Sequence, residues 1–383
     1  MKICIIDTYY ARMLAAHYAR HPGLQGASYA AQHKSLIDGC YGTSDFYSRH
    51  LSELGCEVKD VIANSAGLQR TWAREHGVAY SELALRVPPK FFRVPLVGSW
   101  LAGLPGLMDI ALGQIRAYRP DVLYCQDISF FPGHILERLR ADVGLIVGQI
   151  AAPLPPDSFI KGYDLILTSF PHFVDRLRGM GCASEYFRIG FDTRVLSLLG
   201  TVQKDIDSSF VGGISRHHLK AVPLLDTLAK STDIAFFGYG AEQLPASSPI
   251  RQRHHGEVWG MDMYRALARS RVTVNRHINV AENNANNMRL YEATGVGAAL
   301  LTDKKDNLGE LFEIDKEIIT YSTAAEAVEK IRYYKDHPDE ADAIARAGQA
   351  RTLKEHTYAL RMAELLPILK KHFKRPSARR AAA

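Results

Sequence analysis

Short apolar runs that end in a polar residue recur along this chain, and amphipathic stretches lie between them. In the first half these runs are "KICIIDT", "DVLYCQD", "VGLIVGQI" and "DLILTSF". The stretches "FYSRHLSELG" and "HFVDRLRGMG" each end at a glycine, a residue that commonly terminates a helix. Strands that alternate with helices predict βαβ units, and therefore parallel sheets covered by helices.

The same alternation restarts in the second half, with "SSFVGGI", "DIAFFGYG", "VTVNRHI", "GAALLTD" and "EIITYS". A chain of 383 residues is longer than one core usually holds. We therefore predict an α/β fold with two Rossmann-like, doubly wound domains that face a central cleft, joined by a linker at 192–207. The predicted parts are a first domain at 1–195, a second at 206–354, a helix at 355–375 that packs back on the first domain, and a basic tail at 376–383.

The last long amphipathic stretch begins at "AEAVEKIRYYKDHPDE" and runs to "LLPILKKHF". We predict that this helical region breaks at Pro338 and at Gly348, the two residues in it that least favour a helix interior.

Composition narrows the class of protein. Hydrophobic residues make up 47% and charged residues 23%, values typical of a globular domain and not of a disordered chain. The net charge of +6 suits phosphorylated ligands or an anionic membrane surface, and it is too small to indicate nucleic acid. The five cysteines show no metal or redox spacing, and no signal peptide or clean apolar span is visible. A cytoplasmic protein is expected, with peripheral contact to the inner face of the membrane as an option for "RVPPKFFRVPLVGSW" and the tail.

Open α/β sheets bind ligands beyond the carboxyl ends of their strands. In this sequence the residues at those positions are Asp7, Gln126, Asp127, Gln149, Ser169, Gly212, Gly213, Gly238, Tyr239, Asn275 and His277. Asp127 is a candidate general base, with a loop hydrogen bond as the structural alternative. Asp45 or Ser44 is expected to cap the helix that follows.

The stretch "NNANNMRLYEATG" is rich in hydrogen-bonding side chains. Asn286 or Asn287 is expected to start a short helix, and the exposed N–H groups of a helix start bind anions. Arg289 adds a cationic fork for phosphate, and Glu292 can accept hydrogen bonds from a ribose diol. The alternative is a capped helix on which these two residues simply pair.

The stretch "FVGGISRHHLK" is the second candidate cluster. Gly212 and Gly213 permit close backbone approach, and Arg216 supplies donors for a diphosphate. The spacing fits neither a P-loop nor a dinucleotide fingerprint. Trp259, in "HHGEVWG", either flanks a nucleobase or is a core residue. The adjacent histidines do not have metal-ligand spacing, so no metal is expected.

Several of these motifs occur together and in a recognisable order: "FVGGISR", "FFGYG", "HGEVWGMDMYRALARSRVTVNRH", "NNMRLYEATGVGAALLTD", "ELFE" and "HTYALR". In them the second half resembles the spore-maturation-type (CgeB-like) branch of the family 1/family 4-like glycosyltransferases, which have the GT-B architecture. The first half resembles, less specifically, the acceptor-side domain of that architecture.

The resemblance implies a nucleotide-diphosphate sugar donor held by the second domain, with no metal or other cofactor, and an acceptor held by the first. The donor-binding residues it implies are Gly212, Gly213, Arg216, Gly238, Tyr239, Val258, Trp259, Asn286, Asn287, Met288, Arg289 and Glu292. Of these, Glu292 matches the ribose-binding glutamate, and Val258 and Trp259 match the base-contacting loop. Arg289 is also expected to act in catalysis by neutralising the leaving diphosphate.

One position departs from the pattern. Retaining relatives carry a glutamate eight positions before the second one, where this chain has Asn284. Retention is expected from the surrounding motif; under inversion Asp127 or Asp7 would be the base.

The expected function is transfer of a sugar to an acceptor hydroxyl on a glycan, a protein or a small molecule, without nucleic-acid partners. The alternatives are a sugar-nucleotide isomerase or epimerase of the same fold and a non-catalytic nucleotide-sugar-binding scaffold.

Overall fold

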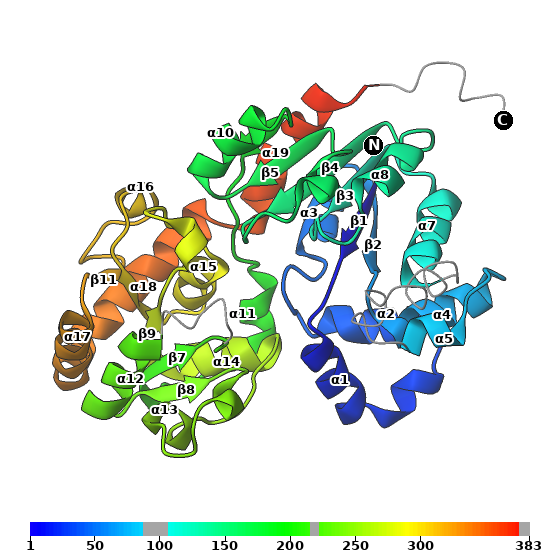
Figure 1. The fold of residues 1–383 in the computed structure, drawn as a ribbon. Helices are drawn as coiled ribbons and strands as arrows, with labels where there is room; N and C mark the ends of the chain where they lie inside the picture. Colours follow the sequence, from blue (N-terminus) through cyan, green and yellow to red (C-terminus); the bar gives the residue numbers. More distant parts are fainter. Residues whose placement is uncertain (87–105, 215–221, 375–383) are drawn as a thin grey trace.

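The computed structural model describes residues 1–86, 106–214 and 222–374 and consists of two α/β lobes side by side (Figure 1). Each lobe is built on a parallel sheet. The first sheet has the order β2-β1-β3-β4-β5-β6 and the second β11-β10-β9-β7-β8. This arrangement confirms the predicted fold class of two Rossmann-like domains.

The strands of the first lobe are short and mostly buried, as expected for a sheet covered on both faces. They are β1 (Lys2–Asp7), β2 (Glu57–Ile62), β3 (Val122–Cys125), β4 (Leu145–Ile150), β5 (Leu165–Thr168) and β6 (Ser184–Tyr186). The second lobe contains β7 (Ile206–Val211), β8 (Ala235–Phe237), β9 (Ser270–Asn275), β10 (Ala299–Asp303) and β11 (Ile319–Tyr321).

The helices of the first lobe begin with α1 (Ala11–Arg20), α2 (Tyr29–Asp38), α3 (Phe46–Glu53), α4 (Ala66–Glu75) and α5 (Glu82–Arg86). They continue with α7 (Leu107–Tyr118), α8 (Gly133–Leu139), α9 (Asp157–Ile160) and α10 (Pro171–Gly179). After α11 (Arg194–Leu199) come α12 (Val222–Ser231), α13 (Pro249–Gln252), α14 (Met261–Arg269), α15 (Met288–Gly295), α16 (Leu308–Leu311), α17 (Ala324–Asp336) and α18 (Pro338–Glu355).

The last helix, α19 (Tyr358–His372), leaves the second lobe and packs on the first (Figure 1). The Tyr358 ring lies against the rings of Phe46 and Tyr47 on α3, with centroids 5.5 and 5.4 Å away. At the crossing, the Phe191 N–H donates to His356 O and the Tyr358 N–H donates to Phe191 O, at 2.8 and 2.9 Å. The two segments that cross between the lobes are therefore bonded to each other as a parallel bridge between Phe191 and Thr357.

The predicted break at Gly348 is wrong, because α18 continues through it. A Cβ at this position would lie 2.3 Å from the Glu317 carbonyl oxygen, so glycine allows the helix to pack against the loop before β11. The helix ends instead near Thr357, whose side chain accepts a hydrogen bond from the Leu360 N–H at 3.3 Å and so caps α19.

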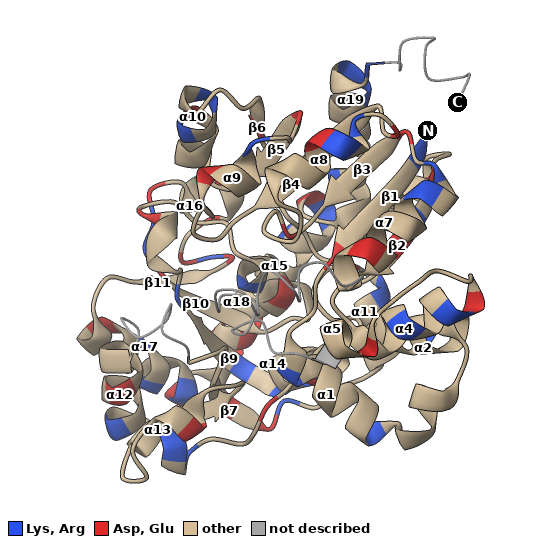
Figure 2. Cartoon of the chain, turned by 45° about the vertical axis from the view of Figure 1, so that its right-hand side comes forward, with Lys and Arg blue, Asp and Glu red and all other residues tan. Residues whose placement is uncertain are grey.

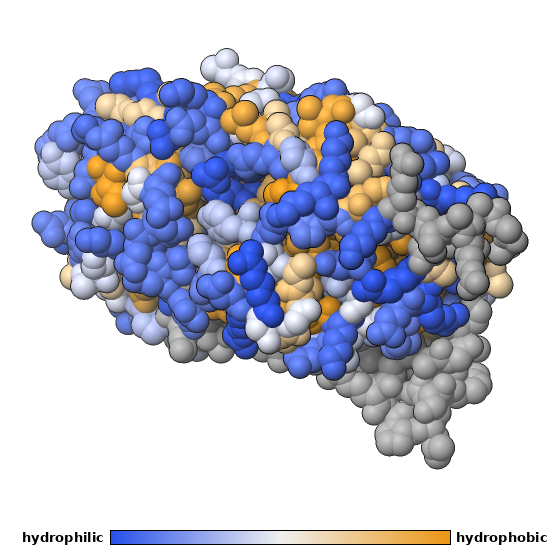
Figure 3. Space-filling view, turned by 90° about the horizontal axis from the view of Figure 1, so that it is seen from above, coloured by the Kyte–Doolittle hydropathy of each residue, from blue (hydrophilic) through white to orange (hydrophobic). Residues whose placement is uncertain are grey.

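Basic and acidic residues are interspersed over both lobes (Figure 2). Seen from above, hydrophobic residues form separate patches among hydrophilic ones (Figure 3). Of the helices in the described ranges, none combines the length and hydropathy needed to cross a bilayer. The stretch "RVPPKFFRVPLVGSW" lies almost wholly outside the described residues, as does the basic tail.

Candidate functional site

The carboxyl ends of the two sheets face each other. Loops that follow strands of one lobe touch loops that follow strands of the other, and we call this contact surface the interlobe seam. Its members are Tyr10, Arg12, Ser169, His172 and Tyr186 from the first lobe and Tyr239, Trp259, Asn284 and Asn286 from the second. The residues after β1 and β3, and the start of α15, lie on these facing edges.

Four aromatic rings meet at one end of the interlobe seam. Tyr239 and Trp259 of the second lobe are stacked, with centroids 5.4 Å apart and planes 11° apart. The edges of Tyr10 and Tyr41 from the first lobe approach Trp259, each at 5.8 Å. Trp259 is half-buried, as is Val258 beside it. The tryptophan is therefore a packing residue of the seam that keeps part of its surface accessible.

The glycine turns after β7 and β8 lie against each other. A Cβ on Gly213 would lie 2.2 Å from Cζ of the Tyr239 ring, and a Cβ on Gly238 would lie 2.2 Å from Gly212 O. Packing between the two loops accounts for the glycines without a ligand. Arg216, also expected at this turn, lies outside the described residues.

The two asparagines at the start of α15 are engaged by the protein. Asn286 is fully buried: its Nδ2 donates to Tyr186 OH at 3.1 Å, and its Oδ1 accepts from Tyr291 OH at 3.0 Å. Asn287 is the N-cap, accepting from the Leu290 N–H, and it exchanges two hydrogen bonds with Asn275. The amide side chains therefore hold the loop in place.

Unlike the asparagine side chains, the first backbone N–H groups of α15 are not bonded by the described part of the protein. No hydrogen bond from described residues engages the N–H of Met288 or of Arg289 in the first turn. The Met288 side chain is half-buried against the core that joins the lobes. The free donors at this helix start, with the helix dipole behind them, suit an anion.

Arg289 and Glu292 form a buried pair and not the solvated surface pair considered from the sequence. Arg289 Nη1 lies 2.8 Å from Glu292 Oε2, and the two side chains are 15% and 7% exposed. Burial raises the pKa of Glu292, and the neighbouring Arg289 charge offsets part of that effect. Arg289 Nη1 is buried and lacks a well-aligned hydrogen-bond acceptor among the described residues. Such a donor costs free energy unless an acceptor is supplied.

Two carboxylates meet on the first-lobe edge, at the ends of the adjacent strands β1 and β3. Asp7 Oδ1 accepts from the Thr8 N–H, while Thr8 Oγ1 donates to Asp127 Oδ2, both at 2.7 Å. The other Asp127 oxygen accepts from the Ser129 N–H at 2.9 Å. Burial raises the pKa of Asp7 to about 7, the Thr8 hydrogen bond lowers it and the Asp127 charge raises it further.

Asn284, at the position where retaining relatives have glutamate, bridges the lobes. Its Nδ2 donates to His172 Nδ1 at 3.0 Å, and the other ring nitrogen of His172 donates to Val280 O at 3.0 Å. Sequence patterns did not single out His172. The only signal available was its place just after the strand "DLILT".

The expected cap at Asp45 or Ser44 is wrong. Asp45 precedes α3 but makes no capping hydrogen bond, because Arg194 binds its carboxylate, at 2.9 Å for one oxygen. Ser44 Oγ donates to Ile37 O instead.

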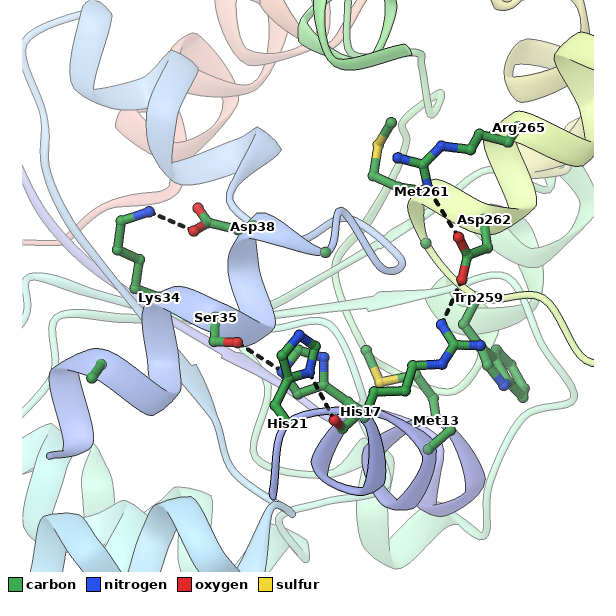
Figure 4. A pocket seen from close by; sticks show the side chains of 15 residues that line it. Met13, His17, His21, Lys34, Ser35, Asp38, Trp259, Met261, Asp262 and Arg265 are labelled. Atoms are coloured by element: carbon green, nitrogen blue, oxygen red, sulfur yellow. Dashed lines mark hydrogen bonds and ion pairs between the residues drawn. The ribbon is translucent and has the colours of Figure 1, made fainter. Parts of the chain in front are cut away.

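A groove of about 610 Å³ lies between α1, α2 and the start of α14, bordered by Trp259 and Gly260 (Figure 4). Its charged side chains are paired with one another: Lys34 with Asp38, and both Arg20 and Arg265 with Asp262. Apart from Trp259, it contains none of the residues predicted from the sequence. No group of three or more His, Cys, Asp or Glu side chains with metal-binding geometry occurs in the parts of the chain described here.

Comparison with known proteins gives two results. Residues 216–367 match the profile of a family described as glycosyl transferase-like. The chain also resembles solved structures over 97–98% of its length: HepE of Anabaena with UDP-glucose (12% identity, TM-score 0.58, 100% of that chain) and sucrose-phosphate synthase of Thermosynechococcus elongatus (11%, 0.58, 99%). A glycosyltransferase of Rickettsia africae is similar at 12% identity and TM-score 0.56, over 100% of that chain. No curated protein sequence matches significantly. The chain thus has the GT-B fold of glycosyltransferases.

Proposed function

We propose that this protein transfers a sugar from a nucleotide-diphosphate sugar to an acceptor hydroxyl. The GT-B fold and the glycosyl transferase-like match over residues 216–367 support it. The single observation that carries it is the start of α15. There, unused backbone N–H groups and a largely buried arginine–glutamate pair, whose Arg289 Nη1 has no well-aligned acceptor among the described residues, occur within one helical turn of each other.

The donor is expected to bind along this turn. The N–H groups of Met288 and Arg289 and the Arg289 side chain are all hydrogen-bond donors, so they suit the oxygens of a diphosphate. Glu292, one turn further on, has a carboxylate available for the ribose hydroxyls. Positive charge and the helix dipole would stabilise the leaving diphosphate without a bound metal or other cofactor.

The acceptor is expected to bind against the first lobe, where the Asp7 and Asp127 carboxylates lie. A glycan, a protein side chain or a small molecule with a free hydroxyl are the acceptor classes that fit. Uridine is the first base to test, because HepE was solved with UDP and with UDP-glucose.

We infer that the anomeric configuration is retained, and that the chain stands near the spore-maturation-type (CgeB-like) branch. Both rest on the resemblance of the "RLYEATG" core. An NMR assignment of the product anomer tests whether the configuration is retained. Retention leaves Asp7 to position the acceptor, whereas inversion would make Asp7 the general base. Asp7 is preferred to Asp127 for that role because fewer of its oxygens accept hydrogen bonds.

A thermal-shift screen against nucleotide sugars tests the proposal. A ligand at 100 times its Kd stabilises the folded chain by about 2.7 kcal/mol, which is readily visible as a higher Tm. We expect one nucleotide sugar to do this and to lose the effect in Glu292→Ala and Arg289→Ala, while Glu313→Ala, an exposed carboxylate on the second lobe, keeps it. No shift with any nucleotide sugar would overturn the proposal, and conversion of the donor without an acceptor would indicate an isomerase.

A further inference from the structure

His277 lies in the loop after β9, at the carboxyl edge of the second sheet, and is 2% exposed. Its Nδ1 is 2.7 Å from Asp303 Oδ1, and its backbone N–H donates to the same oxygen at 3.0 Å. Because a carboxylate only accepts, the proton on this side of the ring is on Nδ1. The ring is held in one orientation by the end of β10.

The other ring nitrogen has no such partner. His277 Nε2 is buried and makes no hydrogen bond with any described residue. A buried polar atom left unpaired destabilises the folded state unless a ligand or water pairs with it. Asp303 does not need the histidine to balance its charge, because Lys305 Nζ lies 3.4 Å from its other oxygen. A ring oriented so firmly, with one nitrogen unused, suits a ligand contact.

The histidine is connected to the proposed donor site by hydrogen bonds. Asn275, at the end of β9, pairs with Asn287, the cap of α15, and donates to Thr302 Oγ1 at 3.0 Å. Thr302 Oγ1 in turn lies 3.4 Å from Asp303 Oδ1. The ends of two adjacent strands and the start of α15 thus form one network at one edge of the sheet.

Two backbone N–H groups at this edge, those of Met288 and Arg289, have no acceptor among the described residues, and Arg289 Nη1, although paired with Glu292, has no well-aligned one. An anion would satisfy them. Because Nδ1 of His277 holds one proton, Nε2 adds a donor when the ring carries a second proton.

We propose that His277 is a further donor-contacting residue, whose Nε2 hydrogen-bonds an oxygen of the donor's diphosphate, with Asp303 as its positioning residue. The inference rests on the proposed function and extends it to a residue on a different strand end from α15. The contact recognises the phosphate groups and not the base or the ribose.

Isothermal titration calorimetry with a series of truncated ligands tests this contact. The wild type is first titrated with UDP, ADP, GDP, CDP and dTDP, and the tightest binder is compared with its monophosphate and nucleoside. We expect His277→Ala to weaken diphosphate binding about 10-fold or more, the usual effect of losing a hydrogen bond to a charged group, and to leave nucleoside binding unchanged. His277→Gln, whose amide can reach the same point, should recover part of the loss, and Asp303→Asn should show the same phosphate-dependent pattern more weakly.

His356→Ala is the matched control. This buried histidine has both ring nitrogens engaged, to Leu311 O and to Arg361, so its loss is purely structural. It should lower the Tm without changing the ratio of diphosphate to nucleoside affinity. Equal weakening of all three ligands by His277→Ala and His277→Gln, or no weakening, would overturn the inference. If the wild type bound no nucleoside diphosphate at all, the proposed function would fail first.

Discussion

The burial of Asp7 raises the pKa of its carboxyl group and thereby affects both the stability of the fold and the chemistry of the candidate site. The carboxylate lies at the end of β1, accepts one hydrogen bond from the Thr8 N–H, and faces the charge of Asp127. Burial is the main reason that its pKa rises to about 7. A carboxyl group with this pKa exchanges protons near neutral pH, which suits the proposed place of Asp7 beside the acceptor.

The raised pKa predicts a pH-dependent gain from Asp7→Asn. The folded state keeps its proton up to about pH 7, whereas the unfolded chain loses it near the ordinary value, so ionisation disfavours folding as pH rises between the two. The variant should melt a few degrees above the wild type at pH 8, and the difference should shrink towards pH 4. Thermal denaturation across this range measures it, with the exposed Asp38→Asn as control. A constant difference would contradict the assignment.

Gly213 is a second residue whose identity follows from a neighbour. Gly213→Ala would place a methyl group against the Tyr239 ring and should destabilise the second lobe by about 1–3 kcal/mol in urea denaturation. Gly67→Ala, in α4 with no atom within 4 Å of the new Cβ, should be neutral or stabilising. Equal effects of the two substitutions would mean that the loops can move apart at little cost.

At the scale of elements, α15 depends on its cap. Asn287→Ala removes the bond to the Leu290 N–H and breaks the pair with Asn275, so it should cost about 1–2 kcal/mol of stability and weaken donor binding as the helix start loosens. Asn283→Ala, an exposed amide nearby, should have a small effect on both. Urea denaturation measures the stability of the two variants, and ligand titration measures their affinity for the donor. If Asn287→Ala were destabilised but bound the donor as tightly as the wild type does, the helix cap would have no role in donor binding.

Periodicity was enough to predict the strands that are apolar throughout, from "KICIID" to "EIITYS". It missed β2 and β6, because an edge strand such as "EVKDVI" carries charges that central strands exclude. Gly348 was misread because a glycine needed for close packing looks, in sequence, like a helix end.

The position of the candidate site at the start of α15 could also be predicted from sequence, but the partners there could not. Asn286 bonds Tyr186, which is 100 positions away in the chain, and Asn284 bonds His172, which is 112 positions away. Local patterns carry no information about such contacts.

Besides the bonded chain crossing at Phe191 and the core that joins the lobes, contacts at both ends of the interlobe seam hold the molecule in its present shape. At one end Arg12 pairs with Glu242 and Glu257; at the other, both ring nitrogens of His172 bind the second lobe. Surface ion pairs contribute little each, so the seam should open without unfolding either lobe.

The double variant Arg12→Ala/His172→Ala should therefore have a larger radius of gyration in small-angle X-ray scattering, with a nearly unchanged Tm. Arg116→Ala, which removes an exposed ion pair inside the first lobe, should leave the radius unchanged. A donor that bridges the lobes should restore the compact value. If the double variant scattered as the wild type does, the aromatic contacts and the core that joins the lobes would account for closure.

The return of α19 to the lobe where the chain begins has a practical consequence. A single proteolytic cut between the sheets releases no intact half, because the leading fragment would lose the helix that shields α3 and the trailing fragment would carry that helix with nothing to cover. Exchanging the second lobe between chains of this fold would succeed only if the exchanged piece ends before Tyr358 and the host keeps its own last helix.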